Sequence, residues 1–166
     1  MASKKALIVL DMQEVCVGKK PLFFFKYDKQ LVDKVNKVIE KNDNVIYIRT
    51  LLKKLPLYYI SPVRVFDGDK RAELVKGLIR KGNVVFDKYR GNAFSNPKLL
   101  KYLMDNKIDT IEVVGVDGAG CVVLAAFSAI KYELKVIINT TAIDTMFKNR
   151  QTRMFKKLKE KGVSFV

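Results

Sequence analysis

The chain has two cysteines, Cys16 and Cys121, as candidate nucleophiles, and it contains no histidine. A thiol is a weak nucleophile until it ionises, so a cysteine enzyme must supply a base that removes the thiol proton. Without histidine, Cys-His and Ser-His pairs are excluded, and so is every zinc site that needs an imidazole ligand. If this protein is an enzyme, its general base must be a carboxylate or an amine.

Three polar residues follow expected β-strands at points where such chemistry could be assembled. Asp11 directly follows the first apolar run of the chain, Lys88 follows the third expected strand, and Cys121 lies in the glycine-rich turn after the fourth. At a helix N-terminus the unpaired N–H groups favour a thiolate, and a nearby ammonium favours it further. An adjacent carboxylate can accept the thiol proton. The three residues therefore fit a nucleophilic Asp-Lys-Cys site.

Each residue also has a purely structural interpretation. A cysteine at a strand-to-helix turn is often a small buried apolar residue, and we expect this role for Cys16. Asp11 could be a turn residue, and Lys88 could be solvated. Spacing alone leaves these alternatives open.

The elements that must position these residues alternate between strand and helix. Strands are expected at Ala6–Leu10, Val45–Ile48, Asn83–Asp87, Asp109–Val116, Leu134–Asn139 and Val163–Val166. Helices are expected after Asp28, after Asn96-Pro97, from Val122 to Ile130 and from Phe147 to Lys161. Such alternation predicts a parallel sheet covered on both faces by right-handed crossovers.

The sequence therefore predicts one domain over residues 1–166 with a three-layer α/β/α, Rossmann-like fold. Its six-stranded, mostly parallel sheet is expected to have the order 3-2-1-4-5-6. The first and fourth strands are then neighbours at the point where the strand order reverses, and ligands bind at that point in open sheets. Asp11 and Cys121 would face each other there, within reach of Lys88.

Residues 51–70 are expected to form a long ordered loop, which compact domains usually keep for a functional reason. The aromatic runs Phe23–Phe25 and Tyr58-Tyr59 fit a pocket wall, a subunit contact or plain core packing.

Three segments of the chain resemble the signature blocks of the isochorismatase-like cysteine hydrolase superfamily. They are Ala6–Gln13 (ALIVLDMQ), Asp87–Ser95 (DKYRGNAFS) and Val114–Val122 (VGVDGAGCV). The superfamily includes isochorismatases, nicotinamidases and N-carbamoylsarcosine amidases, and the resemblance extends over nearly the whole chain. The Asp, Lys and Cys of the family fall on Asp11, Lys88 and Cys121.

The resemblance implies a mechanism for a small amide-like substrate. Asp11 accepts the thiol proton, Lys88 stabilises the charges, and Cys121 attacks the carbonyl to give a thioester. Backbone N–H groups of Asp117 and Cys121 would hold the oxyanion. Family members carry a non-proline cis peptide before the nucleophile, which here corresponds to Val116–Asp117.

The chain departs from the family pattern in two places. Nicotinamidase-type members bind a metal through an Asp and histidines after the second strand, whereas residues 51–70 offer Asp67 and Asp69 but no histidine. We therefore expect no metal and no other cofactor. Asp117 would also place a carboxylate beside the oxyanion hole, which is unfavourable unless that carboxylate points away or is paired.

Five further residues are candidates for the substrate pocket because they lie within the three blocks, close in sequence to Asp11, Lys88 or Cys121. They are Gln13, Tyr89, Arg90, Phe94 and Gly118. Arg90 would suit a substrate carboxylate.

The charge and composition of the chain limit the kinds of partner that we expect it to bind. Lys and Arg number 32 against 17 Asp and Glu, a formal net charge of +15. The basic residues are dispersed instead of clustered, so a phosphate track for nucleic acid is not expected. No apolar run is long enough to cross a bilayer. We expect a cytoplasmic homo-oligomer, a dimer or tetramer, that acts on a small molecule.

Two alternatives to amide hydrolysis remain. One is vinyl-ether hydrolysis of the isochorismatase type, which relies chiefly on an acidic Asp11. The other is a catalytically retired, basic binding protein on the same fold. The glycines Gly115, Gly118 and Gly120 also resemble a nucleotide-binding turn, but their spacing is reversed and they follow the fourth strand.

Overall fold

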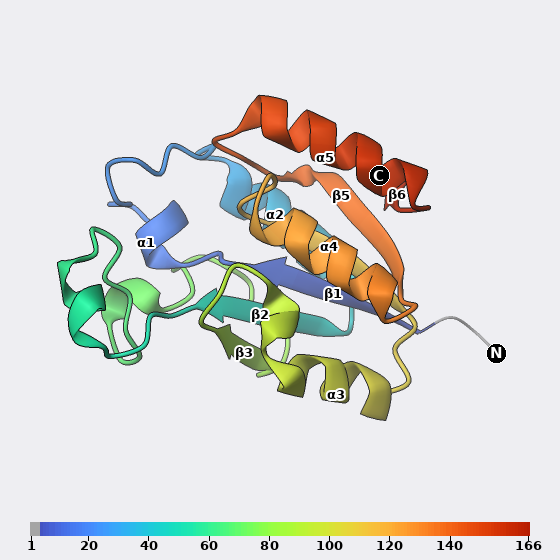
Figure 1. The fold of residues 1–166 in the computed structure, drawn as a ribbon, viewed down its shortest axis with the longest axis horizontal. Coiled ribbons are helices and arrows are strands. Elements are labelled where there is room, and N and C mark those ends of the chain that lie inside the picture. The colour runs from blue at the N-terminus through green and yellow to red at the C-terminus, as the bar shows by residue number, and fades with distance from the viewer. Residues whose placement is uncertain (1–3) are drawn as a thin grey trace.

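The computed structural model describes residues 4–166, and its six strands form one sheet (Figure 1). The sheet order is β3-β2-β1-β4-β5-β6, and every neighbouring pair is parallel. The strands are β1 (Lys5–Leu10), β2 (Val45–Thr50), β3 (Val85–Lys88), β4 (Thr110–Gly115), β5 (Lys135–Ile143) and β6 (Ser164–Phe165). The strand order predicted from the sequence is confirmed.

The two central strands are buried on both faces, as their continuous apolar sequences require. Residues 6–10 of β1 and all of β4 are buried. The side chains of Ala6, Ile8 and Leu10 pack into one core cluster, and those of Leu7 and Val9 pack into another. This alternation follows from the two-residue period of a strand.

Helices cover both faces of the sheet. The principal helices are α2 (Leu31–Glu40), α3 (Pro97–Asp105), α4 (Cys121–Lys131) and α5 (Lys148–Glu160). Helix α2 packs on one face through Leu31, Val35 and Ile39, while α3, α4 and α5 pack on the other. Asn96 caps α3, because its side-chain oxygen accepts a hydrogen bond from the Lys98 N–H group. Pro97 occupies the first turn of the helix, as predicted.

The segments beyond the carboxyl ends of the strands carry more structure than expected. The short helix α1 (Glu14–Val17) follows β1, and the long connection between β2 and β3 contains the 3₁₀ turns η1 (Pro56–Ile60) and η2 (Lys70–Ala72). A third such turn, η3 (Ala93–Ser95), precedes α3. In Figure 1 the strands run from right to left, and α1 and the green segment after β2 lie beyond their carboxyl ends.

Strand β5 is longer than predicted. The polar run after Ile138 suggested an end at Asn139, but pairing with β4 resumes at Ile143, opposite Gly115, after an irregularity in the register. A bulge of this kind hides a strand's continuation from sequence patterning.

Gly115 allows β1 and β4 to approach each other at their carboxyl ends. Its φ is +107°, and a Cβ at this position would collide with the carbonyl oxygen of Leu10. Glycine alone lacks that atom. The close approach brings Asp11 beside the turn after β4, where the Val116–Asp117 peptide bond is cis, as the resemblance implied.

Across the described part of the chain, none of the helices combines the length and apolar character needed to span a membrane.

Candidate active site

The side chains of Asp11, Lys88 and Cys121 lie together at the carboxyl ends of β1 and β3 and the start of α4. The Lys88 ammonium is 3.0 Å from Asp11 Oδ2 and 3.2 Å from Cys121 Sγ. Its third contact, at 2.6 Å, is Thr50 Oγ1. An ammonium has three protons to donate, so these three acceptors satisfy it although Lys88 is only 1% exposed.

The sheet register fixes the position of Lys88. Lys88 is paired with Thr50 across β2 and β3, and the preceding pair is Arg49 with Asp87. The Arg49 guanidinium binds the Asp87 carboxylate through two hydrogen bonds, of 2.7 Å from Nε and 3.0 Å from Nη2. This two-point ion pair joins β2 and β3 one residue before Thr50 and Lys88, on the opposite face of the sheet from the Lys88 ammonium.

Asp11 turns the chain out of β1. Its backbone has φ +54°, in the left-handed region that Asp tolerates better than most residues. Its N–H group still donates to the carbonyl of Ile48 on β2 at 3.0 Å, so the residue is anchored to the sheet while its carboxylate faces Lys88.

Thr50 is a member of this cluster that the sequence analysis missed. Its hydroxyl accepts a hydrogen bond from Lys88 and donates one of 2.7 Å to Asp11 Oδ1. The hydroxyl therefore links the ammonium to Oδ1 of Asp11, while the ammonium itself pairs with Oδ2. The feature of the sequence that could have identified Thr50 is its position at the carboxyl end of β2, the strand that neighbours β1 and therefore Asp11.

Replacing Thr50 with valine is expected to lower the free energy of unfolding by about 1–3 kcal/mol, because the variant leaves a buried ammonium proton and a carboxylate oxygen without this partner. Thr50→Ser keeps the hydroxyl and should lose less than about 1 kcal/mol. Urea titration followed by circular dichroism measures both values. Thr50→Val removes the hydroxyl and Thr50→Ser removes the methyl group, so equal losses in the two variants would contradict the larger contribution expected of the hydroxyl.

The charges of the cluster follow from burial and from the neighbours. The pKa of the Cys121 thiol is raised to about 12. Burial is the main cause and the Asp11 carboxylate the second, whereas the Lys88 ammonium acts in the opposite direction. For Lys88, burial lowers the pKa of the ammonium, but Asp11 and Cys121 outweigh burial and the pKa is raised overall. At neutral pH Cys121 is therefore a thiol beside a charged Lys88.

A mostly apolar cavity of about 270 Å³ opens above Asp11 and Cys121. It is small for a ligand site, since such pockets usually measure about 300–1,000 Å³. The cavity is lined by Asp11, Gln13, Val15, Cys16, Phe25, Tyr27, Thr50, Val63, Val65, Val116, Asp117, Ala119, Gly120, Cys121, Met146, Phe147 and Arg150.

The Asp117 carboxylate is paired within the protein. Its Oδ1 accepts hydrogen bonds from the Ala119 N–H group and the Thr145 hydroxyl, each at 2.7 Å. Its Oδ2 accepts from the Met146 N–H group at 3.0 Å and from the Tyr27 hydroxyl at 3.2 Å. Burial and the Asp117 charge together raise the pKa of Tyr27, which remains a neutral donor.

The backbone after Asp117 is held in a tight turn into α4. The Asp117 carbonyl accepts from the N–H groups of Gly120 and Val122, at 3.0 and 3.2 Å. Cys121 is the first residue of α4. Its sulfur is therefore carried by the first turn of a helix, where the helix dipole favours negative charge.

The other cysteine, Cys16, lines the same cavity and is half-buried. Burial raises the pKa of the Cys16 thiol, and the charges of Asp11 and Cys121 add to this. Among the described residues, the Lys88 ammonium contacts Asp11, Thr50 and Cys121. None of its hydrogen bonds goes to Cys16.

Of the five additional pocket candidates, only Gln13 lines the cavity. Its amide is already used by the backbone, donating to Thr50 O and Ala72 O and accepting from the Thr50 N–H group. Phe94 is buried in the core against Tyr132, and the Gly118 N–H group donates to Asp144 O.

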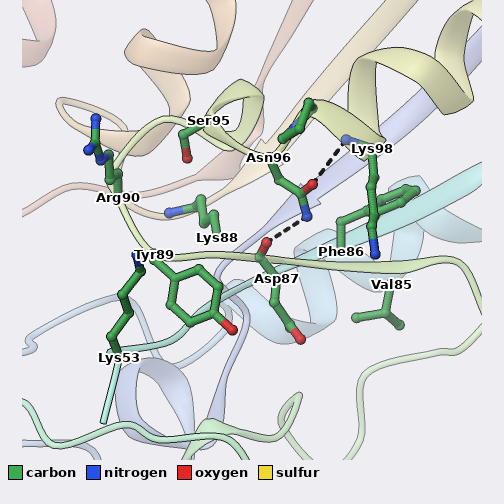
Figure 2. Close-up of a pocket in the computed structure, with 11 residues that line it drawn as sticks. Lys53, Val85, Phe86, Asp87, Lys88, Tyr89, Arg90, Ser95, Asn96 and Lys98 are labelled. Carbon is green, nitrogen blue, oxygen red and sulfur yellow. Dashed lines mark hydrogen bonds between the residues drawn. The ribbon is translucent and has the colours of Figure 1, made fainter. Parts of the chain in front are cut away.

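Tyr89 and Arg90 line a different, open pocket along the free edge of β3 (Figure 2). Figure 2 shows Asp87 and Tyr89 on one side of the strand and the Lys88 ammonium on the other, as the alternation of a strand requires. Lys53 lies over the Tyr89 ring at 5.9 Å. Neither Tyr89 nor Arg90 therefore reaches the cavity above Cys121.

The residues after β2 do not form a metal site. Asp69 accepts a hydrogen bond from the Arg71 N–H group and caps the turn η2. Within residues 4–166 no group of three or more His, Cys, Asp or Glu side chains could hold a metal ion.

The fold and this site can be compared with known proteins. No curated protein matches the chain. Similar solved structures include an isochorismatase-like hydrolase from Alkaliphilus metalliredigens, with 20% identity, a TM-score of 0.85 and coverage of 99% of this chain and 92% of that one. N-carbamoylsarcosine amidase from Thermoplasma acidophilum has 22% identity, a TM-score of 0.82 and coverage of 98% and 95%. The pyrazinamidase of Pyrococcus horikoshii, solved in complex with zinc, has 21% identity, a TM-score of 0.82 and coverage of 98% of each chain.

At these identities the structural likeness establishes the fold. Family membership comes from the sequence, in which the model of the isochorismatase domain matches residues 5–166. Because that match includes all six strands and every residue of the cluster at their carboxyl ends, the chain belongs to the isochorismatase family of hydrolases.

Proposed function

We propose that this protein is a cysteine hydrolase that cleaves the C–N bond of a small amide-like substrate through an Asp11-Lys88-Cys121 triad. The observation that carries the proposal is the position of the Lys88 ammonium, within hydrogen-bond distance of both the Asp11 carboxylate and the Cys121 sulfur. This arrangement supplies a nucleophile, a base and a charge-stabilising group without histidine.

The first half of the reaction forms a thioester. Asp11 accepts the thiol proton of Cys121 as the sulfur attacks the substrate carbonyl, and Lys88 offsets the charge left on both groups. The N–H groups of Asp117 and Cys121 donate to the carbonyl oxygen as it becomes an oxyanion. The C–N bond then breaks, and protonated Asp11 gives its proton to the leaving amine.

The second half hydrolyses the thioester. Asp11 accepts a proton from a water molecule, whose oxygen attacks the thioester carbonyl. The C–S bond breaks, the carboxylic acid leaves, and the proton on Asp11 returns to the Cys121 sulfur. Each half-reaction uses Asp11 once as a base and once as an acid.

Pairing of Asp117 supports this arrangement of the oxyanion site. Four hydrogen bonds from Tyr27, Ala119, Thr145 and Met146 hold the carboxylate. A carboxylate engaged in this way repels an oxyanion less than a free one, because its charge is spread over its donors.

The proposal is tested by small amides and by an electrophile. Nicotinamide, pyrazinamide and N-carbamoylsarcosine, the substrates implied by the names of structural neighbours, serve as probes for ammonia release. Acrylamide labelling followed by peptide mapping reports thiol reactivity. We expect amide turnover and an adduct on Cys121. An adduct on Cys16 with Cys121 unlabelled would overturn the proposal and favour a retired binding protein.

Alkylation of Cys121 by iodoacetamide is expected to accelerate about tenfold per pH unit between about pH 7 and 10. The pKa of the thiol is raised from an ordinary value of 9.0 to about 12, so the reactive thiolate stays a minor form throughout this range. Lys88, whose pKa is also raised, stays charged. Rates are measured by peptide mapping, and a plateau below about pH 9 would contradict this assignment of charges.

A further inference from the structure

The free edge of β3 borders an open pocket that is separate from the cavity above Cys121 (Figure 2). This pocket has a volume of about 790 Å³, which lies within the range of small-molecule sites. Lys88 is among the lining residues, but its ammonium lies on the other side of the strand, where it contacts Asp11 and Cys121. The pocket is therefore not part of the site proposed for hydrolysis.

Three basic side chains line the pocket at β3, and none of them has a counter-ion within the protein. Lys53, Arg90 and Lys98 are all exposed. Among residues 4–166, none of these three side chains takes part in an ion pair or donates a hydrogen bond. The Lys53 ammonium lies over the ring of Tyr89, 5.9 Å from its centroid. The pocket therefore presents positive charge that a bound anion would neutralise.

The negative charge at this pocket is already neutralised. In the described part of the chain, Asp87 is the one acidic residue that lines it, and the Arg49 guanidinium donates hydrogen bonds of 2.7 and 3.0 Å to its carboxylate. Helix α3 begins at Pro97, beside the pocket, and has no acidic residue in its first turn. The positive end of the helix dipole therefore adds to the three basic side chains and favours an anion.

A second lysine-rich pocket, between α2 and β5, suits an anion less well. It has a volume of about 420 Å³ and is lined by Lys5, Lys34, Lys37 and Lys41. The buried carboxylate of Glu112 also lines it and pairs with Lys5 at 2.6 Å. Lys41 is the C-cap of α2, where the helix dipole is negative and disfavours an anion. The pocket at β3 is therefore the better anion site.

The pocket at β3 also offers an aromatic surface. Tyr89 is 50% exposed, and Val85, Phe86 and Pro97 add apolar lining. In Figure 2 the Tyr89 ring projects from the strand beside Lys53. Exposed aromatic rings beside basic side chains bind nucleobases, because every base has a π face that stacks on the ring. The pocket thus combines a stacking surface with unpaired cations.

We propose that this pocket binds a free nucleoside polyphosphate. The base stacks on the ring of Tyr89, and the phosphates bind the basic side chains of Lys53, Arg90 and Lys98. An inorganic anion would leave the ring uncovered, and a nucleoside would leave the cations unpaired. Because the three cations are spread along the pocket, a chain of phosphates contacts more of them than a single phosphate does (Figure 2).

Isothermal titration calorimetry at about 150 mM salt tests the proposal with ATP, adenosine and inorganic triphosphate. We expect ATP to bind about tenfold or more tightly than adenosine or triphosphate, because each of these carries only part of the recognised groups. Equal affinities for ATP and triphosphate would show that the base is not recognised and would overturn the inference. Absence of ATP binding would also overturn it, and binding of single-stranded hexaadenylate in that case would point to a nucleic-acid surface.

Variants assign the binding to the pocket. Tyr89→Ser should weaken ATP binding by about fivefold or more and leave triphosphate binding unchanged, whereas Tyr89→Phe should keep the wild-type affinity. Arg90→Gln should weaken the binding of both ligands by about fivefold. Arg153→Gln and Tyr59→Ser are the matched controls, since both residues are exposed and neither lines the pocket. If the controls weaken binding as much as the pocket variants do, the inference is overturned.

Alkylation of Cys121 with iodoacetamide shows which of the two pockets the nucleotide occupies. The added group enters the cavity above Cys121, whereas the sulfur does not line the pocket at β3. ATP should bind the alkylated protein with unchanged affinity, and loss of binding would overturn the inference. Amide hydrolysis without ATP binding would overturn this inference alone. ATP binding without amide hydrolysis would overturn the proposed function alone.

Discussion

Replacement of Cys121 with alanine is expected to lower kcat/KM for amide hydrolysis by about 10⁴-fold or more. The variant removes the sulfur that must form the thioester, which lies 3.2 Å from the Lys88 ammonium. Ammonia release from whichever probe amide the wild-type protein turns over measures the loss. Circular dichroism verifies that the variant folds.

Cys16→Ala is the matched control for the loss of a thiol. Its sulfur lines the cavity but is not a hydrogen-bond partner of Lys88, so we expect kcat/KM to change by less than about tenfold. Activity that persists in Cys121→Ala would reject the thioester route. It would favour a reaction that depends chiefly on Asp11 as an acid, such as vinyl-ether hydrolysis.

Asp11→Asn is expected to separate thiol reactivity from catalysis. Hydrolysis should fall by about 10³-fold or more, because the amide can neither accept the thiol proton nor protonate the leaving amine. Alkylation of Cys121 at pH 8 should instead become faster, by about tenfold or more. The Asp11 carboxylate helps to raise the pKa of the thiol, and Lys88 lowers it, so removing the carboxylate charge favours the thiolate.

The sign of this second effect distinguishes the proposed role from simple disruption of the site. A merely damaged site would lose hydrolysis and alkylation together, or would expose both cysteines equally. Asp105→Asn, an exposed position on α3, should leave both rates unchanged. Slower alkylation of Cys121 in Asp11→Asn, in a variant that folds, would contradict the role of Asp11 as the base.

The sequence determined the strand order and the convergence of Asp11, Lys88 and Cys121. Alternating helices and strands require right-handed crossovers, and these place the carboxyl ends of all six strands at one edge. Residues that directly follow β1, end β3 or begin α4 must then meet near the point where the strand order reverses. The prediction requires that the ends of the strands are known to within a residue or two, and the ends of the apolar runs in the sequence give these positions.

Side-chain direction was harder to predict near the ends of strands. Tyr89 and Arg90 adjoin Lys88 in the sequence, yet they line the pocket at the edge of β3 (Figure 2). A shift of one residue along a strand moves a side chain to the opposite face. Proximity in sequence to a functional residue is therefore weak evidence for the same pocket.

Only the tertiary structure revealed Thr50 and the pairing of Asp117. Thr50 joins the cluster through the parallel pairing of β2 with β3, and Asp117 is held by donors from residue 27 and from residues 145 and 146. These contacts join segments that are far apart in the chain, and their geometry depends on how loops and helix starts pack, which no local periodicity encodes.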